Sequence, residues 1–291
     1  MSTGAGTTGA GAPGPPGAAA TAVAAAARAL ARAVPVPAGA GMARVVVERN
    51  LMAFRRAWVL LITGFLEPVF YLFSLGVGVG ALVRTVTTDS GAVVPYATFV
   101  APALLAAAAM NGAVLSTFNV FFKLKYARLY DSVLATPLGP RDVAVGEVLW
   151  SLSRGALYSA AFLLVAAAAG MVSSWWALAA LPAAVLIGFA FSAVGMFATT
   201  YLRSWVDLDL ITLGIQPLFL FSATFFPLSS YPASLQLLVQ LTPLYHGVAL
   251  ERALMLGEIA PGLLVHVAYL AALGLVGVVG AARRIERLLL S

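Results

Sequence analysis

The sequence predicts an all-α integral membrane protein with six transmembrane helices, and three observations lead to that class. Hydrophobic residues make up 62% of the chain and charged residues only 10%, whereas soluble domains have roughly 45–50% and about 25%. Six apolar stretches are each near or above the ~20 residues that cross a bilayer. The lysine and arginine residues lie almost entirely in alternate connections between these stretches, a pattern typical of membrane proteins.

The first 40 residues form a separate tail rich in Ala, Gly and Pro. Such a composition cannot bury enough apolar surface to offset the entropy of the chain. Arg28 and Arg32 follow its apolar run instead of preceding it, which is the wrong order for a signal peptide. We therefore expect residues 1–40 to be a disordered cytoplasmic tail and residues 41–291 to be the transmembrane domain.

An N-terminal amphipathic helix is predicted over residues 44–58. Large apolar side chains share one side and charged side chains the other, which suits a helix lying in the lipid interface. A solvated helix that packs on a partner protein would show the same pattern. The apolar side comprises Val46, Val47, Leu51, Phe54 and Trp58, and the charged side comprises Arg44, Glu48, Arg49, Arg55 and Arg56.

The six apolar stretches follow this helix and fix the expected topology. They run over about residues 57–83, 94–122, 143–171, 175–202, 208–226 and 261–282. If the N-terminus is inside, only Arg84 and Arg252 of the 17 lysine and arginine residues lie outside. This bias predicts a multi-pass protein of the cell membrane with both termini cytoplasmic.

The segment between the fifth and the last span predicts an extracellular re-entrant helix pair. Its apolar run over residues 233–241 is too short to cross the bilayer. We expect His246 to be an outer-face residue and neither a metal ligand nor a proton carrier. The residues that define this segment are Pro227, Pro232, Pro243 and His246.

The connection between the second and third spans predicts a short amphipathic helix on the cytoplasmic side, which Pro137 ends. Aromatic and aliphatic anchors at helical spacing fit a groove on a partner protein. A helix that only joins two spans is the alternative. The anchors are Tyr126, Leu129, Tyr130, Val133 and Leu134.

Glu67 lies midway along the first span and is followed by Pro68. A carboxylate at membrane depth is costly and therefore marks a candidate functional residue. It could carry a proton, or it could accept hydrogen bonds from a neighbouring helix whose ladder Pro68 has opened. The sequence leaves both roles open.

Four further charged residues predict a network near the cytoplasmic side. Glu147 and Arg154 begin the third span seven residues apart, on one helix face, and could pair with Arg203 or Asp207 after the fourth span. We expect a salt-bridge network there in preference to a transport pathway.

The sequence contains no motif for nucleotide binding or catalysis. Neither Lys123 nor Lys125, the only lysines, follows a glycine-rich turn, so the chain has no phosphate-binding loop. There is no cysteine, and two histidines are too few for a typical histidine metal centre. The net charge of +6 indicates topology before nucleic-acid binding. We expect a chain without enzymatic activity, bound cofactor or nucleic-acid partner.

Three stretches of the chain carry a resemblance to a known family. They are Glu67–Gly80, residues 134–142 followed by Gly146 and Glu147, and residues 225–236 with 241–247 and Arg252. Over about residues 44–287 the chain resembles the membrane subunits of ABC-2 type ABC exporters, particularly the nodulation-factor and daunorubicin-type drug permeases. The third stretch is the most specific, because it combines prolines with His246 and Arg252.

The resemblance implies six spans, an interfacial helix, a cytoplasmic coupling helix at the predicted amphipathic segment and an extracellular re-entrant pair. It also implies a separate ATPase subunit, which would bind ATP and Mg²⁺, and a second permease subunit in a homo- or heterodimer. The implied activity is export of drugs, lipids or glycans, including multidrug efflux. A proton-coupled transporter that uses Glu67 is the alternative, and a membrane-bound lipid transferase is disfavoured because no loop gathers catalytic residues.

Overall fold

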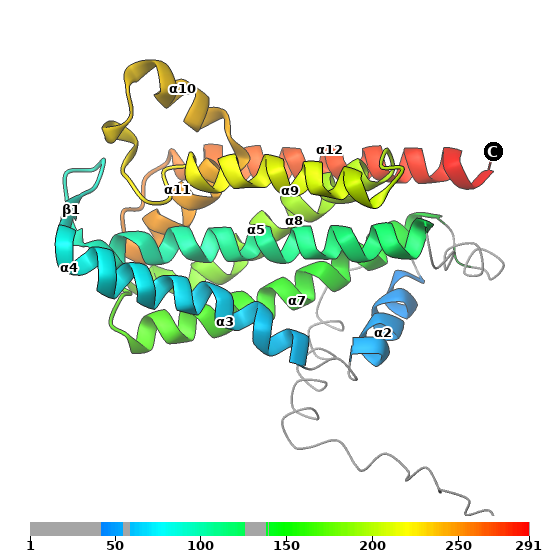
Figure 1. The fold of residues 1–291 in the computed structure, drawn as a ribbon, viewed down its shortest axis with the longest axis horizontal. Helices are drawn as coiled ribbons and strands as arrows, with labels where there is room; N and C mark the ends of the chain where they lie inside the picture. The colour runs from blue at the N-terminus through cyan, green and yellow to red at the C-terminus, as the bar shows by residue number, and fades with distance from the viewer. Residues whose placement is uncertain (1–41, 55–58, 126–137, 139, 291) are drawn as a thin grey trace, which may run out of the picture.

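A computed structural model describes residues 42–54, 59–125, 138 and 140–290. The long helices lie along the longest axis of the molecule, with a two-stranded hairpin at one end and α2 at the other (Figure 1). The elements are α2 (Ala43–Phe54), α3 (Val59–Phe73), the π-helix η1 (Ser74–Val79), α4 (Gly80–Val83), β1 (Thr85–Thr87), β2 (Val93–Pro95), α5 (Tyr96–Lys125), α7 (Pro140–Ala168), η2 (Trp175–Ala179), α8 (Ala180–Thr199), α9 (Trp205–Leu220), η3 (Leu228–Ser230), α10 (Ala233–Leu241), α11 (Pro243–Leu256) and α12 (Leu263–Leu290). The predicted tail lies outside the described residues.

Five helical segments of the described chain are long and apolar enough to cross a membrane. The chain is therefore of the multi-pass membrane type. The five segments are Leu66–Val83, Tyr96–Lys123, Val145–Ala168, Trp175–Thr199 and Leu263–Arg284. The predicted span over residues 208–226 is not among them, because α9 has only 16 residues. At ~1.5 Å per residue it covers roughly 24 Å, against a hydrocarbon core of about 30 Å. Pro217 lies near its end, and Ala223 beyond it has a positive φ of 54°.

The core forms around α5, which packs against α8, α7, α11 and α3. Its first half is rich in alanine, and five of these alanines are buried: Ala101, Ala103, Ala106, Ala107 and Ala109. Small side chains let neighbouring helices approach closely where lipid provides no hydrophobic drive for association. The contact between α8 and α12 is equally close, since a Cβ at Gly277 would lie 2.6 Å from the backbone carbon of Ala193.

A helix, α2, forms over residues 43–54 of the segment predicted as amphipathic, and part of its apolar face is covered by the chain itself. Residues 55–58 of that segment lie outside the described residues. Val46 and Val47 are buried, and α2 packs on α7. A Cβ at Gly146 would lie 2.6 Å from Cβ of Val46 and 2.8 Å from the carbonyl oxygen of Ala43, so only a glycine lets the two helices touch there. Lipid or a partner is therefore not needed to cover these two valines.

The glycine-rich end of the first span is a π-helix. Gly76 and Gly78 lie within η1, and Gly76 also lies close to Ala97, to whose Cβ an added Cβ would come within 3.2 Å. The first span thus ends in a loosened turn before the hairpin, in which β1 and β2 pair antiparallel with Val86 opposite Val94.

The segment predicted as a re-entrant pair forms two unequal helices. The nine-residue α10 projects from the bundle (Figure 1), whereas α11 packs against α5, α8 and α12. The hydroxyl of Thr242 accepts a hydrogen bond from the backbone N–H of Tyr245 at 3.4 Å and caps α11, which begins at Pro243 and ends at Gly257 with φ 84°. Neither helix is long enough to be a candidate span.

Candidate functional site

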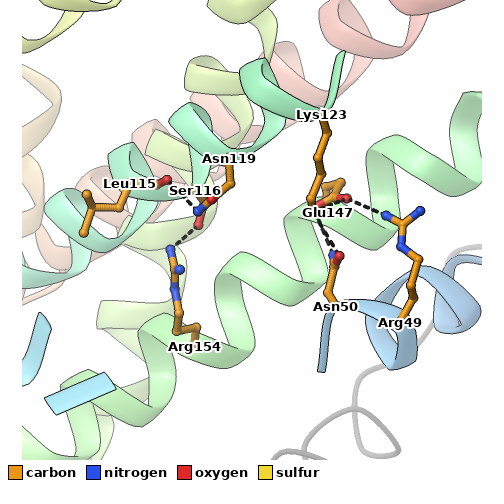
Figure 2. A network of polar contacts seen from close by, with 8 residues as sticks. All are labelled: Arg49, Asn50, Leu115, Ser116, Asn119, Lys123, Glu147 and Arg154. Carbon is orange, nitrogen blue, oxygen red and sulfur yellow. Dashed lines mark hydrogen bonds and ion pairs between the residues drawn. The ribbon is translucent and has the colours of Figure 1, made fainter. Parts of the chain in front are cut away.

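Glu147 is the centre of a buried polar cluster that joins three helices (Figure 2). Its side chain is only 3% exposed, and Lys123 places Nζ 2.8 Å from each carboxylate oxygen. Asn50 Nδ2 donates to Oε2 at 3.0 Å, and Arg49 Nη2 donates to Oε1 at 3.3 Å. Lys123 Nζ also donates to Asn50 Oδ1 at 2.9 Å, which closes the cluster. The four side chains come from α2, α5 and α7.

The cluster lies near Lys125, the last described residue of α5, and near the start of α7 at Pro140. Lys123 lies within two residues of that limit of α5. Removing one partner from a buried ion pair leaves an uncompensated charge, so such a cluster holds its helices in one arrangement. The cluster therefore ties α2 to both helices that flank residues 126–139.

Arg154 occupies the same face of α7, two turns beyond Glu147. It is 9% exposed, and its Nη2 donates to Ser116 Oγ at 2.7 Å (Figure 2). The same nitrogen donates to the carbonyl oxygen of Gly112 at 3.2 Å. The guanidinium thus meets the middle of α5 through neutral oxygen atoms. This contact adds a second polar link between α5 and α7.

The predicted pairing of Glu147 and Arg154 with Arg203 or Asp207 is wrong, because Glu147 meets Lys123, Arg49 and Asn50, and Arg154 meets Ser116 and Gly112. Asp207 instead accepts hydrogen bonds from the backbone N–H groups of Arg203 at 2.6 Å and Ser204 at 3.0 Å, which cap α9. These two hydrogen bonds hold the pKa of Asp207 below its usual range. Sequence reasoning missed Lys123 as a partner, because it counted that residue only as a topology signal. The opposite charges at the end of the second span and the start of the third could have indicated the pair.

Glu67 lines a cavity of about 90 Å³ on the flank of the molecule. The walls come from α3, α5, α7 and α9 and include the polar side chains of Asn111, Tyr158 and Gln216. Glu67 is exposed, and its carboxylate makes no hydrogen bond or ion pair with any residue that the structure describes. The structure therefore does not show the hydrogen bonds from a neighbouring helix that were one of its two expected roles.

The placement of His246 at the outer face stays a prediction, and the structure shows its side chain buried between α11 and α12. Its Nδ1 lies 2.8 Å from Nδ1 of His266, and its ring stacks on Tyr269 with the centroids 3.9 Å apart. Burial, together with the nearby His266, lowers the pKa of His246 to about 4. Pro227 and Pro232 precede η3 and α10, and Pro243 is the first residue of α11.

Two charged residues on α11 are buried. Arg252, which the charge distribution assigned to the outer side, places its guanidinium 3.9 Å from the centre of the Phe99 ring and donates to the carbonyl oxygen of Ala223 at 2.8 Å. Glu251 is fully buried, and its carboxylate oxygens meet no hydrogen-bond partner in the part of the chain described. Burial raises the pKa of Glu251 well above its usual range.

The five anchors of the predicted coupling helix, Tyr126, Leu129, Tyr130, Val133 and Leu134, lie outside the described residues. The structure places only the helices on either side of them. Their role stays a prediction.

Comparison with known proteins shows which family this chain resembles. The model of the ABC-2 type transporter family matches residues 43–256. The chain is 36% identical over 229 residues to Nodulation protein J of Sinorhizobium fredii (strain NBRC 101917 / NGR234), a match that covers 77% of this chain and 85% of that protein. It is 33% identical over 230 residues to Nodulation protein J of Rhizobium leguminosarum bv. viciae, which covers 77% and 86%.

The match begins at α2 and ends with α11, so it includes the Glu147 cluster, the Glu67 cavity and both helices of the predicted re-entrant pair. The family consists of membrane components of transporters and not of enzymes. With five candidate spans and a match over most of its length, the chain belongs to the ABC-2 type transporter family, as a permease component.

Proposed function

We propose that this chain is the membrane-spanning permease subunit of an ATP-driven exporter, and that a separate ATPase subunit binds ATP and Mg²⁺ and supplies the energy. The observation that carries the proposal is the Glu147 cluster. It fastens α2 to α5 and α7, the two helices that border residues 126–139 in the sequence. The sequence has no phosphate-binding loop, which is consistent with hydrolysis on a partner.

The proposed mechanism is mechanical. Closure of the ATPase moves the segment that contains Tyr130 and Leu134. Because Lys123 and Glu147 bond to each other and to α2, the three helices receive this motion as one unit. Without that link, a push on the connection would bend the end of α5 alone. The chain itself contributes no catalytic residue to ATP hydrolysis.

The flank formed by α3 and α4 supports a second permease subunit as a partner. Phe70, Val77 and Leu82 are 64%, 70% and 85% exposed. Large apolar side chains that the chain does not cover are met by lipid or by another apolar surface. We propose that two permease subunits, identical or related, meet along this flank and pass an amphipathic drug, lipid or glycan between them.

The test is transport in liposomes that contain the permease together with an ABC ATPase subunit from the same organism. The probes are rhodamine 6G and a fluorescent NBD-labelled phosphatidylcholine. We expect movement of one of them to require ATP, to stop with an ATPase whose phosphate-loop lysine is replaced, and to continue when an ionophore abolishes the proton gradient.

One observation favours a second candidate, a proton-coupled transporter. Glu67 lies in a cavity at membrane depth without a partner among the described residues, as a proton carrier would. In the same liposomes, movement that a pH gradient drives without ATP, and that Glu67→Gln abolishes, would establish this candidate and refute the first.

A further inference from the structure

The cavity at Glu67 has the composition of a binding site and not of a packing defect. A packing defect in a membrane bundle is lined by apolar atoms, whereas this one contains a carboxylate, two carboxamides and a phenol, contributed by Glu67, Asn111, Gln216 and Tyr158. The four residues come from four helices that are far apart in the sequence. Polar groups that converge on one hollow at membrane depth are expensive to keep there unless something uses them.

The cavity carries a negative charge that no described residue of opposite charge compensates. The carboxylate of Glu67 forms no ion pair with any described residue. Arg154 is bonded to the carbonyl oxygen of Gly112, a residue of the cavity wall, and does not reach Glu67. In a medium of low dielectric constant, a bare carboxylate gains most from a cation brought beside it.

The aromatic residues of the cavity also favour a bound cation. Tyr71 and Phe219 both line the cavity, and their rings meet edge to face with centroids 6.4 Å apart. Phe219 in turn contacts Phe225 at 5.1 Å. The faces of such rings attract an ammonium group, most strongly where water is excluded. Carboxylate and aromatic faces together therefore select positive charge.

The surroundings suit an amphiphile. Next to the cavity the flank of α3 continues as a second, largely apolar hollow lined by Leu66, Phe70 and Ser74 as well as by Glu67 and Tyr71. A hydrocarbon tail can lie on this apolar surface while its head group enters the cavity, because Glu67 lines both hollows.

We propose that the cavity is a binding site for the protonated amine of an amphipathic cation, with Glu67 as its counter-charge, Asn111 and Gln216 as hydrogen-bond acceptors, and Tyr71 and Phe219 as its aromatic wall. The proposal deepens the proposed function, since it assigns the charge class of the exported molecule. The binding itself does not depend on an ATPase and can be tested without one.

The experiment measures ligand-induced stabilisation of the purified permease in lipid nanodiscs at pH 7. The probes are octylamine, which is a cation at this pH, and octanol, which has the same chain and no charge. We expect octylamine to raise the unfolding midpoint more than octanol does. Glu67→Gln should raise the apparent Kd for octylamine by roughly ten-fold or more and leave the response to octanol unchanged.

Two controls make the result specific. Glu48→Gln removes an exposed carboxylate on α2 and should behave like the wild type. Glu67→Asp keeps the charge and should retain part of the octylamine response. A second readout needs no variant: dicyclohexylcarbodiimide labelling of wild-type Glu67, read by mass spectrometry, should be slowed by octylamine and not by octanol.

Two outcomes would overturn the proposal. One is an octylamine response that is the same in Glu67→Gln and the wild type, with no protection of Glu67 from the carbodiimide. The other is an equal loss of the octanol and octylamine responses, which would make Glu67 an acceptor for hydroxyl groups of neutral substrates. Failure of ATP-driven transport with octylamine binding intact would refute the exporter and not this site.

Discussion

Among single residues, Glu147 has the most consequential position, because its carboxylate compensates two cations at once. In Glu147→Gln, Lys123 and Arg49 would remain close together with no negative charge between them. Breaking a buried pair in this way costs about 3–5 kcal/mol, and the partial exposure of Lys123 favours the lower end. We predict this loss in the free energy of unfolding of the permease in nanodiscs.

The matched control is Glu48→Gln. Its ion pair with Arg44 is also made by α2, but both side chains are about half exposed, at 54% and 51%. Exposed pairs contribute roughly 0–1 kcal/mol. Equal losses in the two variants would show that the Glu147 cluster does not hold the helices together.

The histidine pair predicts a pH dependence of stability. The pKa of His246 is lowered from 6.5 to about 4 in the folded chain. Between these values the unfolded chain binds a proton that the folded chain does not, so stability falls as the pH decreases from about 6.5 towards 4. The unfolding midpoint should decrease over this window, and His246→Gln should flatten the decrease. An unchanged slope in the variant would assign the effect to other groups.

For individual helices, the contact of α2 with α7 depends on the absence of a side chain at residue 146. An added methyl group would lie 2.6 Å from Val46 Cβ and 2.8 Å from a backbone oxygen of α2, too close for either to yield without movement of the helix. We predict that Gly146→Ala separates α2 from α7 and exposes Val46. The structure brings Met42 and Asp142 within hydrogen-bond distance of each other, with 3.1 Å between the backbone nitrogen and Oδ1. Crosslinking of cysteines placed at these two positions, compared between the chain with Gly146 and the Gly146→Ala chain, would measure the separation.

The helices themselves were largely predictable from the sequence, whereas their partners were not. Long apolar runs define α5, α7, α8 and α12, because lipid selects composition over whole helices. The apolar run predicted that the fifth span continues to residue 226, whereas α9 ends at Leu220. The sequence after Pro217 is still apolar, but Pro217 and the positive φ of Ala223 interrupt the helix.

The polar contacts depend on which helices become neighbours, and composition does not encode this. Glu147 meets Asn50 and Lys123 across 97 and 24 residues of sequence. His246 meets His266 because α11 folds back against α12. Glu67 was found as a candidate from the sequence alone, because a carboxylate within an apolar run is conspicuous without any knowledge of its neighbours.

For the whole molecule, the distribution of lysine and arginine predicts the orientation. Six crossings, with α9 as one of them although it is not among the candidate spans, would place both termini in the cytoplasm and α10 at the outer side. Cysteines at Ser2 and Ser291 should react with an impermeant maleimide only after cells are opened, whereas a cysteine at Ser234 should react in intact cells. Labelling of Ser291→Cys in intact cells would mean an odd number of crossings, and thus that α9 or α10 has been assigned wrongly.

The central claim is that an ATPase drives this permease through the segment between α5 and α7. Its most direct test is co-purification of the two subunits, followed by substrate-stimulated ATP hydrolysis, with Tyr130→Ala combined with Leu134→Ala. Aromatic and aliphatic anchors dominate most interfaces, while rim charges contribute little. The double variant should stay in the membrane but lose ATPase binding or stimulation, and Lys125→Gln should retain both. Wild-type binding and stimulation in the double variant would contradict the account and move the ATPase contact to α2.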